Sequence, residues 1–154
     1  MPKLIRNAQI IEDSWLPVEA EAETLSAGHI ASLSQWLALD SKGNTAVQLE
    51  PGELPSPLLN HLDDLELVAI NFPVLTDGRG FTYARELRDA GYTGELRAVG
   101  GFVRDQMHYL MRCGFNAFQL SDDKELDGAL SSLDDFTEHY QAAADQPQPL
   151  FRRR

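Results

Sequence analysis

The chain has 154 residues, and its 24 acidic side chains against 13 basic ones give a formal net charge of −11. This length fits one domain with a sizeable core. The acidic balance excludes the basic surface that nucleic-acid binding requires, so no nucleic acid is expected as a partner. No apolar run is long enough to cross a bilayer, and the N-terminal residues lack the apolar core of a signal peptide. We therefore expect a cytoplasmic protein with no membrane partner.

Cys113 is the only cysteine of the sequence. It therefore cannot form an internal disulfide, and it cannot supply the several thiolates of an iron–sulfur cluster. A free cysteine is usually a small core side chain, and a reactive thiol is the alternative. The histidines show no metal-ligand spacing, so no metal site is expected. They are His29, His61, His108 and His139.

The N-terminal part is predicted to contain a hairpin, a connector and a helix. Residues 4–11 favour a short β-hairpin that turns near Asn7, and residues 12–24 favour an exposed connector anchored by Trp15. A helix is expected from about residue 26 to residue 41, because apolar residues recur there at helical spacing. Those residues are Ile30, Leu33, Trp36 and Leu37.

Four strand–helix units are predicted after the N-terminal part. Apolar runs predict strands at residues 45–50, 66–72, 95–99 and 115–120. The helices between and after them are marked by a short segment at 55–62, by Phe81, Ala84 and Leu87, by Met107, Leu110 and Met111, and by Leu126, Ala129 and Leu130. A last helix is expected at 134–145, followed by a flexible tail at 146–154. The whole is then one α/β domain over residues 1–145, with 1–44 as its N-terminal part and 45–133 as the βα units.

Side chains of the four strands separate into an apolar face and a polar face, since they alternate along a strand. The apolar face should pack beneath the helices, and it holds Val47, Leu49, Val68, Ile70, Phe72, Leu96, Ala98, Phe118 and Leu120. On the other face each strand contributes one polar residue, namely Gln48, Asn71, Arg97 and Gln119. A doubly wound sheet would be apolar on both faces. We therefore expect a half-barrel of parallel βα repeats whose concave face is polar.

Arg97 is the only charged residue among these four polar positions. A charged side chain inside a parallel strand is costly to bury without a partner. One interpretation is an ion pair with Glu50 or Asp77, and the other is the binding of an anion. A shift of the register by one residue would instead turn Arg97 toward the helices.

Two loops at the carboxyl ends of neighbouring strands carry the candidate site. Asp77-Gly78-Arg79-Gly80 and Arg104-Asp105-Gln106 each bring an acid and a base to the start of a helix, where anions are favoured. Turn chemistry and helix capping are the plain alternatives. Residues 71–112 hold six arginines against five acids, a net positive segment in an acidic chain. The candidate catalytic residues are Asp77 and Asp105, and the candidate anion-binding or ligand-binding residues are Asn71, Arg79, Arg97, Arg104, Gln106 and Gln119.

These residues resemble a bacterial family known as domain of unknown function 934, which carries the label of an oxidoreductase involved in sulfite reduction. The resemblance runs from about Val47 to Leu120. It is densest in Asn71-Phe72-Pro73, Asp77-Gly78-Arg79-Gly80, Leu87-Arg88, Gly94-Glu95-Leu96-Arg97-Ala98, Gly100, Arg104-Asp105-Gln106 and Arg112-Cys113-Gly114-Phe115. The chain departs from the family at Leu75, where an aromatic is usual, and at Gly101, where an Asp is common. The second departure weakens an acid–base assignment there.

The resemblance implies a role in sulfur assimilation, with sulfite reductase as the partner. The residues themselves carry no cluster thiolates, no haem ligands and no nucleotide fingerprint, whereas redox chemistry normally needs a cofactor. One hypothesis is a non-redox accessory or binding protein of assimilatory sulfite reduction. The alternative is a small enzyme that binds an anionic substrate such as sulfite, sulfate or phosphate, or a flavin phosphate, at the βα-loop end. Four βα units leave sheet edges open, so a homodimer is also expected.

Overall fold

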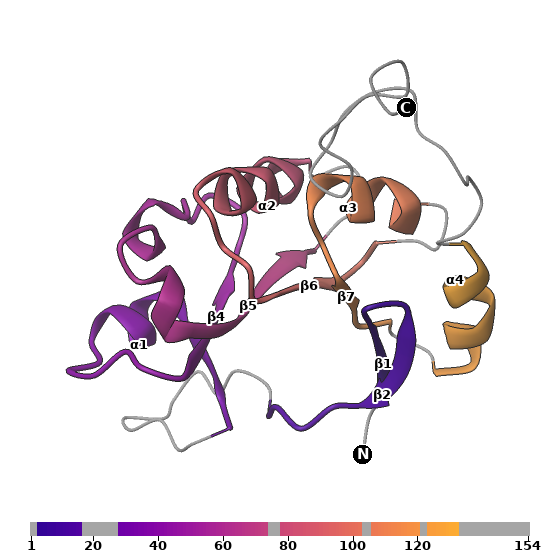
Figure 1. Ribbon diagram of the computed structural model, residues 1–154, viewed down its shortest axis with the longest axis horizontal. Helices are drawn as coiled ribbons and strands as arrows, with labels where there is room; N and C mark the ends of the chain where they lie inside the picture. Colours follow the sequence, from indigo (N-terminus) through magenta and orange to yellow (C-terminus); the bar gives the residue numbers. More distant parts are fainter. Residues whose placement is uncertain (1–2, 17–27, 74–77, 103–105, 121–122, 133–154) are drawn as a thin grey trace, which may run out of the picture.

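The computed structural model describes residues 3–16, 28–73, 78–102, 106–120 and 123–132. It is a mixed α/β structure built on one seven-stranded sheet, with the helices packed against one side of that sheet (Figure 1). The α/β class expected from the sequence is confirmed. The predicted helix at 134–145 and the tail at 146–154 lie outside the described residues.

The sheet contains the four strands predicted for the βα units, the two strands of the predicted hairpin and one further strand, β3. The strand order is β2-β1-β7-β6-β5-β4-β3. Strands β3 to β7 run parallel, whereas β1 is antiparallel to both β7 and β2. The bounds are β1 Lys3–Arg6, β2 Gln9–Glu12, β3 Ile30–Ser32, β4 Thr45–Leu49, β5 Leu65–Phe72, β6 Glu95–Gly100 and β7 Ala117–Phe118. The last is shorter than the predicted strand at 115–120.

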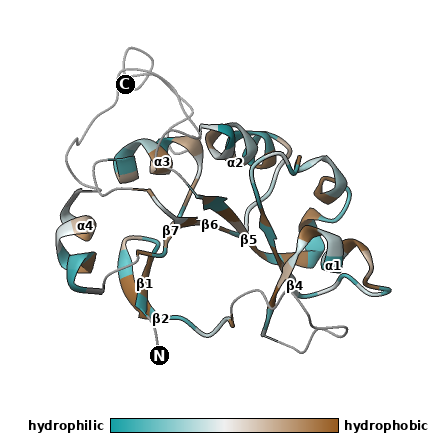
Figure 2. Cartoon of the chain, turned by 180° about the vertical axis from the view of Figure 1, so that it is seen from behind, coloured by the Kyte–Doolittle hydropathy of each residue, from teal (hydrophilic) through white to brown (hydrophobic). Residues whose placement is uncertain are grey.

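Four α-helices are described, together with three short 3₁₀ turns. The helices are α1 Leu33–Leu37, α2 Arg79–Asp89, α3 Met107–Cys113 and α4 Leu126–Ser132, and the turns are η1 Ser56–Leu58, η2 Leu62–Asp64 and η4 Asp123–Glu125. Figure 2 shows hydrophilic stretches on α2 and α4 and hydrophobic colour along strands such as β1 and β4. The main core lies between the sheet and the helices, because its buried residues come from the strands and from α1 to α4.

The predicted N-terminal hairpin is confirmed. Asn7 and Ala8, between β1 and β2, both have positive φ, at 50° and 60°. Two such residues in a row are the signature of the primed turns that match the twist of a tight hairpin. The hairpin turns its Ile5 into the main core and lengthens the sheet beyond β7.

The helix predicted from about residue 26 to residue 41 is confirmed only for Leu33–Leu37, and among the described residues 28–32 and 38–41 are not α-helical. Residues 30–32 form β3, with Ile30 opposite Ala46 and Ala31 opposite Val47. The helix begins only at Leu33, because Ser32 caps it: the Ser32 hydroxyl accepts from the Gln35 N–H, and the Gln35 side chain accepts from the Ser32 N–H. Helical spacing of apolar residues was misleading here, since the strand has both faces covered and buries consecutive residues.

The predicted division of the sheet into two faces is confirmed. The register aligns Val47, Val68 and Leu96 across β4, β5 and β6. Each is fully buried and belongs to the core beneath the helices. The next row aligns Gln48, Ala69, Arg97 and Ala117 on the opposite face.

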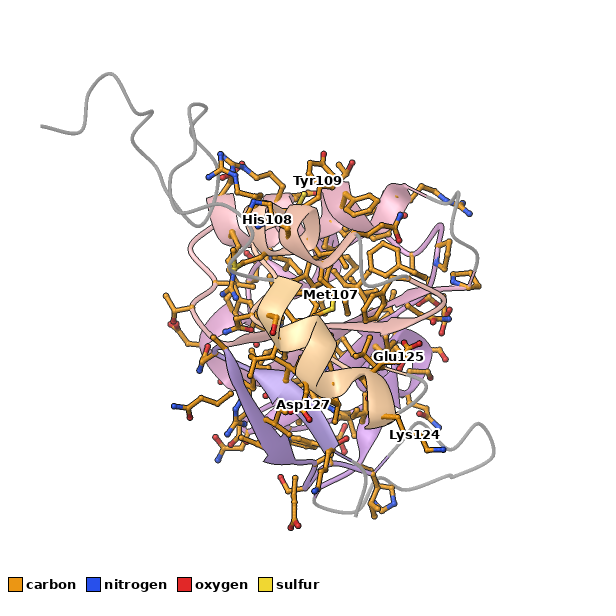
Figure 3. The ribbon with its side chains drawn as sticks, turned by 90° about the vertical axis from the view of Figure 1, so that its right-hand side faces the viewer. Met107, His108, Tyr109, Lys124, Glu125 and Asp127 are labelled. Atoms are coloured by element: carbon orange, nitrogen blue, oxygen red, sulfur yellow. The ribbon has the colours of Figure 1, made fainter. Side chains whose placement is uncertain are left out.

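α3 and α4 close the core at the side of the β1–β2 hairpin. Met107 is fully buried in this core, while Tyr109 on the same helix is 59% exposed. Figure 3 shows Met107 beneath α3 and Tyr109 at the outer side of the molecule, with α4 lying beside the hairpin. α3 ends at Gly114, whose φ of 119° completes a left-handed cap.

Gly80 allows α2 to lie directly on β5. A Cβ at this position would lie 2.6 Å from the Phe72 ring and 2.8 Å from a methyl carbon of Ile70. We expect Gly80→Ala to lower the free energy of unfolding by roughly 1–3 kcal/mol through overpacking. Better helix propensity offsets only part of this loss, by at most about 1 kcal/mol.

Urea unfolding measures the effect of this substitution. Gly43→Ala is the matched control, because a Cβ on Gly43 meets no atom within 4 Å. It should change stability by no more than about 0.5 kcal/mol. Equal stability of both variants would contradict the close packing of α2 on β5.

Tyr92 and Arg88 tie the amino ends of β5 and β6 to α2. The buried Tyr92 hydroxyl is 3.2 Å from the Leu65 carbonyl oxygen and 3.3 Å from that of Glu95, and it donates to this pair of acceptors. Arg88 donates to the carbonyl oxygens of Gly114, Tyr92 and Gly94. Burial raises the pKa of the Tyr92 phenol well above its ordinary value of 10.0.

This shift predicts a loss of stability at alkaline pH. The folded state holds the Tyr92 proton more tightly than the unfolded chain does, so its contribution is complete below pH 10.0 and is lost as pH rises further. Tyr92→Phe should therefore unfold with a shallower dependence on pH above that value. Chemical denaturation at a series of alkaline pH values tests this, and parallel curves for the two proteins would contradict it.

Candidate functional site

The residues where β5 and β6 pass into their loops lie against each other at the carboxyl edge of the sheet. The Gly101 N–H donates to the Phe72 carbonyl oxygen at 2.5 Å. Gly100 has a φ of 97°, and a Cβ there would overlap Asn71 Oδ1. The two predicted loops therefore begin side by side, as the parallel topology led us to expect.

Glu50 is the carboxylate of this edge. The Asn71 Nδ2 group donates to its Oε2 at 2.6 Å, and the Gln48 Nε2 group donates to its Oε1 at 2.8 Å. All three side chains are half-buried. Sequence reasoning considered Glu50 only as a partner for Arg97, although a polar pair at alternate positions near the end of a strand could have identified it.

Arg79 lies at the first turn of α2 and faces the loop after β4. Its Nη1 atom is 3.6 Å from where a Cβ on Gly52 would stand. The Gly52 N–H in turn donates to the Tyr83 hydroxyl at 3.0 Å, which fixes that loop against α2. Arg79 is exposed and lies at the same edge that carries Glu50.

Arg97 lies on the predicted face and meets two carboxylates. Its Nε donates to Glu95 Oε1 at 2.9 Å and its Nη1 to Asp13 Oδ2 at 3.0 Å. Arg6 completes the group by an ion pair with Glu95 Oε2 at 3.3 Å. The resulting ion cluster of Arg6, Asp13, Glu95 and Arg97 has no formal net charge, and Arg97 is only 1% exposed.

The partners of Arg97 differ from those that the sequence suggested. Glu95 lies two positions earlier on the same strand, so the period of two was enough to place it beside Arg97. Asp13 is 84 positions away in the segment that follows β2, and no local pattern links it to β6. Glu50, the expected partner, instead binds Gln48 and Asn71.

The other predicted site residues have the following places. Gln106 is half-buried at the N-cap of α3. Gln119 is half-buried just after β7, and its backbone N–H donates to the Ala98 carbonyl oxygen at 2.9 Å. Asp77, Arg104 and Asp105 lie outside the described residues, so their roles stay predictions.

Cys113 ends α3 one turn after Tyr109 and is partly buried. Its electrostatic interaction with the Tyr109 phenol and a hydrogen bond between the two side chains raise the pKa of Tyr109. In the part of the chain that the structure describes, no group of three or more His, Cys, Asp or Glu residues is placed to hold a metal ion. Within the same residues, no helix is long and apolar enough to span a membrane.

The ion cluster predicts a large cost for the loss of Arg97. Arg97→Leu leaves Asp13 and Glu95 buried without the guanidinium, so we expect a loss of about 3–5 kcal/mol in the free energy of unfolding. Arg97→Lys should lose less, since an ammonium keeps the charge but not the fork that meets two carboxylates.

Arg85→Leu is the control for this series. It removes an exposed pair with Asp89, in which the side chains are 46% and 64% exposed, and should change stability by less than about 1 kcal/mol. Thermal and urea unfolding of the variants supply the comparison. A stability of Arg97→Leu equal to that of Arg85→Leu would show that the cluster contributes little.

Comparison with known proteins places the chain in a family. No curated protein and no solved structure shows a significant match to the chain. A family model described as a bacterial protein of unknown function (DUF934) matches residues 46–151, which include β4 from its second residue, β5 to β7 and α2 to α4. Because this match covers more than half of the chain, the protein belongs to the DUF934 family of bacterial proteins of unknown function.

Proposed function

We propose that this protein is a non-redox accessory of assimilatory sulfite reduction that binds a partner protein, with sulfite reductase as that partner. Its contact surface would be the carboxyl edge of the sheet, around Glu50, Asn71 and Arg79. The resemblance of the sequence supplies the biological context, and a cytoplasmic location is part of the proposal.

One observation favours binding of a protein over turnover of a small anion. Arg97 was the central cation of the anion site expected from the sequence, and its charge is balanced by Asp13 and Glu95. At the edge itself Glu50 adds a negative charge beside Asn71, which opposes a small anion there. A half-exposed surface of mixed polar groups suits a protein contact, in which rim charges set orientation and rate.

The shape of the sheet gives secondary support. Five consecutive parallel strands with helices on one side are the arrangement that a half-barrel requires, and we propose that form for the βα units. In such a layout the loops after the strands stand on one rim. The proposed contact surface is that rim.

A second candidate is a small enzyme that binds an anionic substrate or a flavin phosphate at the same edge. The exposed Arg79 at the start of α2, an eleven-residue helix, supports this alternative, since helix N-termini favour anions. Asp77 and Asp105 would then supply acid–base chemistry, and Arg104 a further cation.

A binding experiment separates the two candidates. Full-length protein should be mixed with purified sulfite reductase, and separately titrated by calorimetry with sulfite, sulfate, phosphate and flavin mononucleotide. We expect association with the reductase that weakens at least tenfold in Glu50→Gln and in Asn71→Ala, through loss of the bonds between them. Glu66→Gln, an exposed change at the other end of β5, is the control and should bind normally.

The outcomes differ sharply. In one outcome, an anion or the flavin gives a heat of binding that Arg79→Ala abolishes, and the protein does not associate with the reductase. That outcome would contradict the accessory proposal and favour the enzyme. Light scattering of the free protein tests the predicted homodimer in the same samples, with a monomer mass contradicting it.

A further inference from the structure

A short segment after β2 crosses the side of the sheet that the helices leave uncovered. Trp15 packs there on Ile30, Ala46 and Leu67, forming a second, small apolar cluster. Figure 1 shows this segment running from β2 beneath the sheet toward β4. We call residues 13–16 the strap.

Within the described residues, the strap is bonded to the rest of the chain through Asp13 at one end and Leu16 at the other. Asp13 binds Arg97 through one oxygen and the Trp15 N–H through the other. At its far end the Leu16 N–H donates to the Gly28 carbonyl oxygen at 2.7 Å, and the Ile30 N–H donates to the Leu16 carbonyl oxygen at 2.9 Å. Leu16 itself is 52% exposed. The strap thus lies on the sheet as an isolated bridge, whereas the strands beneath it are held in ladders.

The charges beneath the strap make Asp13 the equivalent of a bound ligand. With the strap in place, the ion cluster has two arginines and two carboxylates. Without Asp13 it keeps Arg6, Arg97 and Glu95, so its formal net charge becomes positive, although Arg97 stays bound to Glu95 and the Arg6 side chain is 43% exposed. Arg97 Nη1 then lacks its acceptor. An oxyanion of carboxylate geometry would restore both the charge balance and the hydrogen bond.

We propose that the strap can lift, and that Arg97 is the centre of a latent site for a small oxyanion, which Asp13 fills when the strap is closed. A small anion and the strap then compete for one guanidinium. The ligand class is a carboxylate or an oxyanion of similar size, because it must replace one carboxylate oxygen at Nη1. The proposal concerns this chain alone and does not depend on sulfite reductase.

The competition lowers the measured affinity for the anion by a factor that can be estimated. A ligand that binds only the open form has its affinity reduced by the fraction of molecules that are open. If the open form is a minor state of roughly 0.1–10%, the closed strap weakens binding by about 10- to 1000-fold. Removing the Asp13 carboxylate should recover that factor.

Formate is the probe, because it is the group that Asp13→Ala removes. Calorimetry and thermal unfolding should show formate binding to Asp13→Ala at least about tenfold more tightly than to the parent, with a larger rise in melting temperature. Asp13→Asn keeps the space filled by an amide and should not respond. Glu12→Ala, an exposed change next to the strap, should respond like the parent. Sulfite in place of formate tests whether the site accepts a larger oxyanion.

Hydrogen exchange of the parent protein tests the lifting itself. The amides of Leu16 and Ile30 should exchange through local opening, at least about tenfold faster than that of Ile70 in the middle of β5. Trp15→Ala should speed them further while leaving Ile70 unchanged. If these amides exchange only at the rate of Ile70, or if formate affects Asp13→Ala no more than Glu12→Ala, the latent site is rejected.

Discussion

The open side of this sheet is organised by the need to bury the charge of Arg97 in a central strand. A guanidinium in that position requires acceptors on both edges of its fork, and the chain supplies them from two places. Glu95 comes from the same strand, and Asp13 from a segment that has to cross the sheet to reach it. The crossing brings Trp15 over Ile30, Ala46 and Leu67 near the start of the parallel strands, so the segment that supplies the ion pair also covers a second apolar cluster.

The helix-covered side of the sheet depends on a different constraint, which is the close approach of backbone segments at two glycines. α2 contacts β5 where Gly80 faces Phe72, and the loops after β5 and β6 touch where Gly100 faces Asn71. These contacts set the distance between the first turn of α2 and the carboxyl edge of the sheet. They therefore place Arg79 near the loop after β4 and leave the amide of Asn71 directed at Glu50. The candidate surface is thus a product of backbone packing as much as of its polar side chains.

The sequence predicted the parts of this fold that follow from a local period. The four parallel strands, their apolar and polar faces and the hairpin at Asn7 come from alternation or turn chemistry that a few neighbouring residues carry. The strand at Ile30 was missed because three residues, of which Ile30 and Ala31 are buried, are too few to show a period of their own, and its assignment depends on pairing with β4. The candidate site divides in the same way. Asn71 and Arg97 were found from the face of a strand, but Glu50 and Asp13 acquire their partners only through the folded chain.

The position of Asp13 has a consequence for what counts as the folding unit. The region that matches the family begins at residue 46, at the second position of β4. Its core strand β6 nevertheless relies on Asp13, its edge strand β7 pairs with β1, and β4 pairs with β3. A fragment that started at the family boundary would leave β7 without β1 and β4 without β3. It would also leave Ala46 and Leu67 without the cover of Trp15, and Arg97 without one carboxylate. The folded chain therefore uses β1, Asp13 and β3, all of which lie before the region that matches the family.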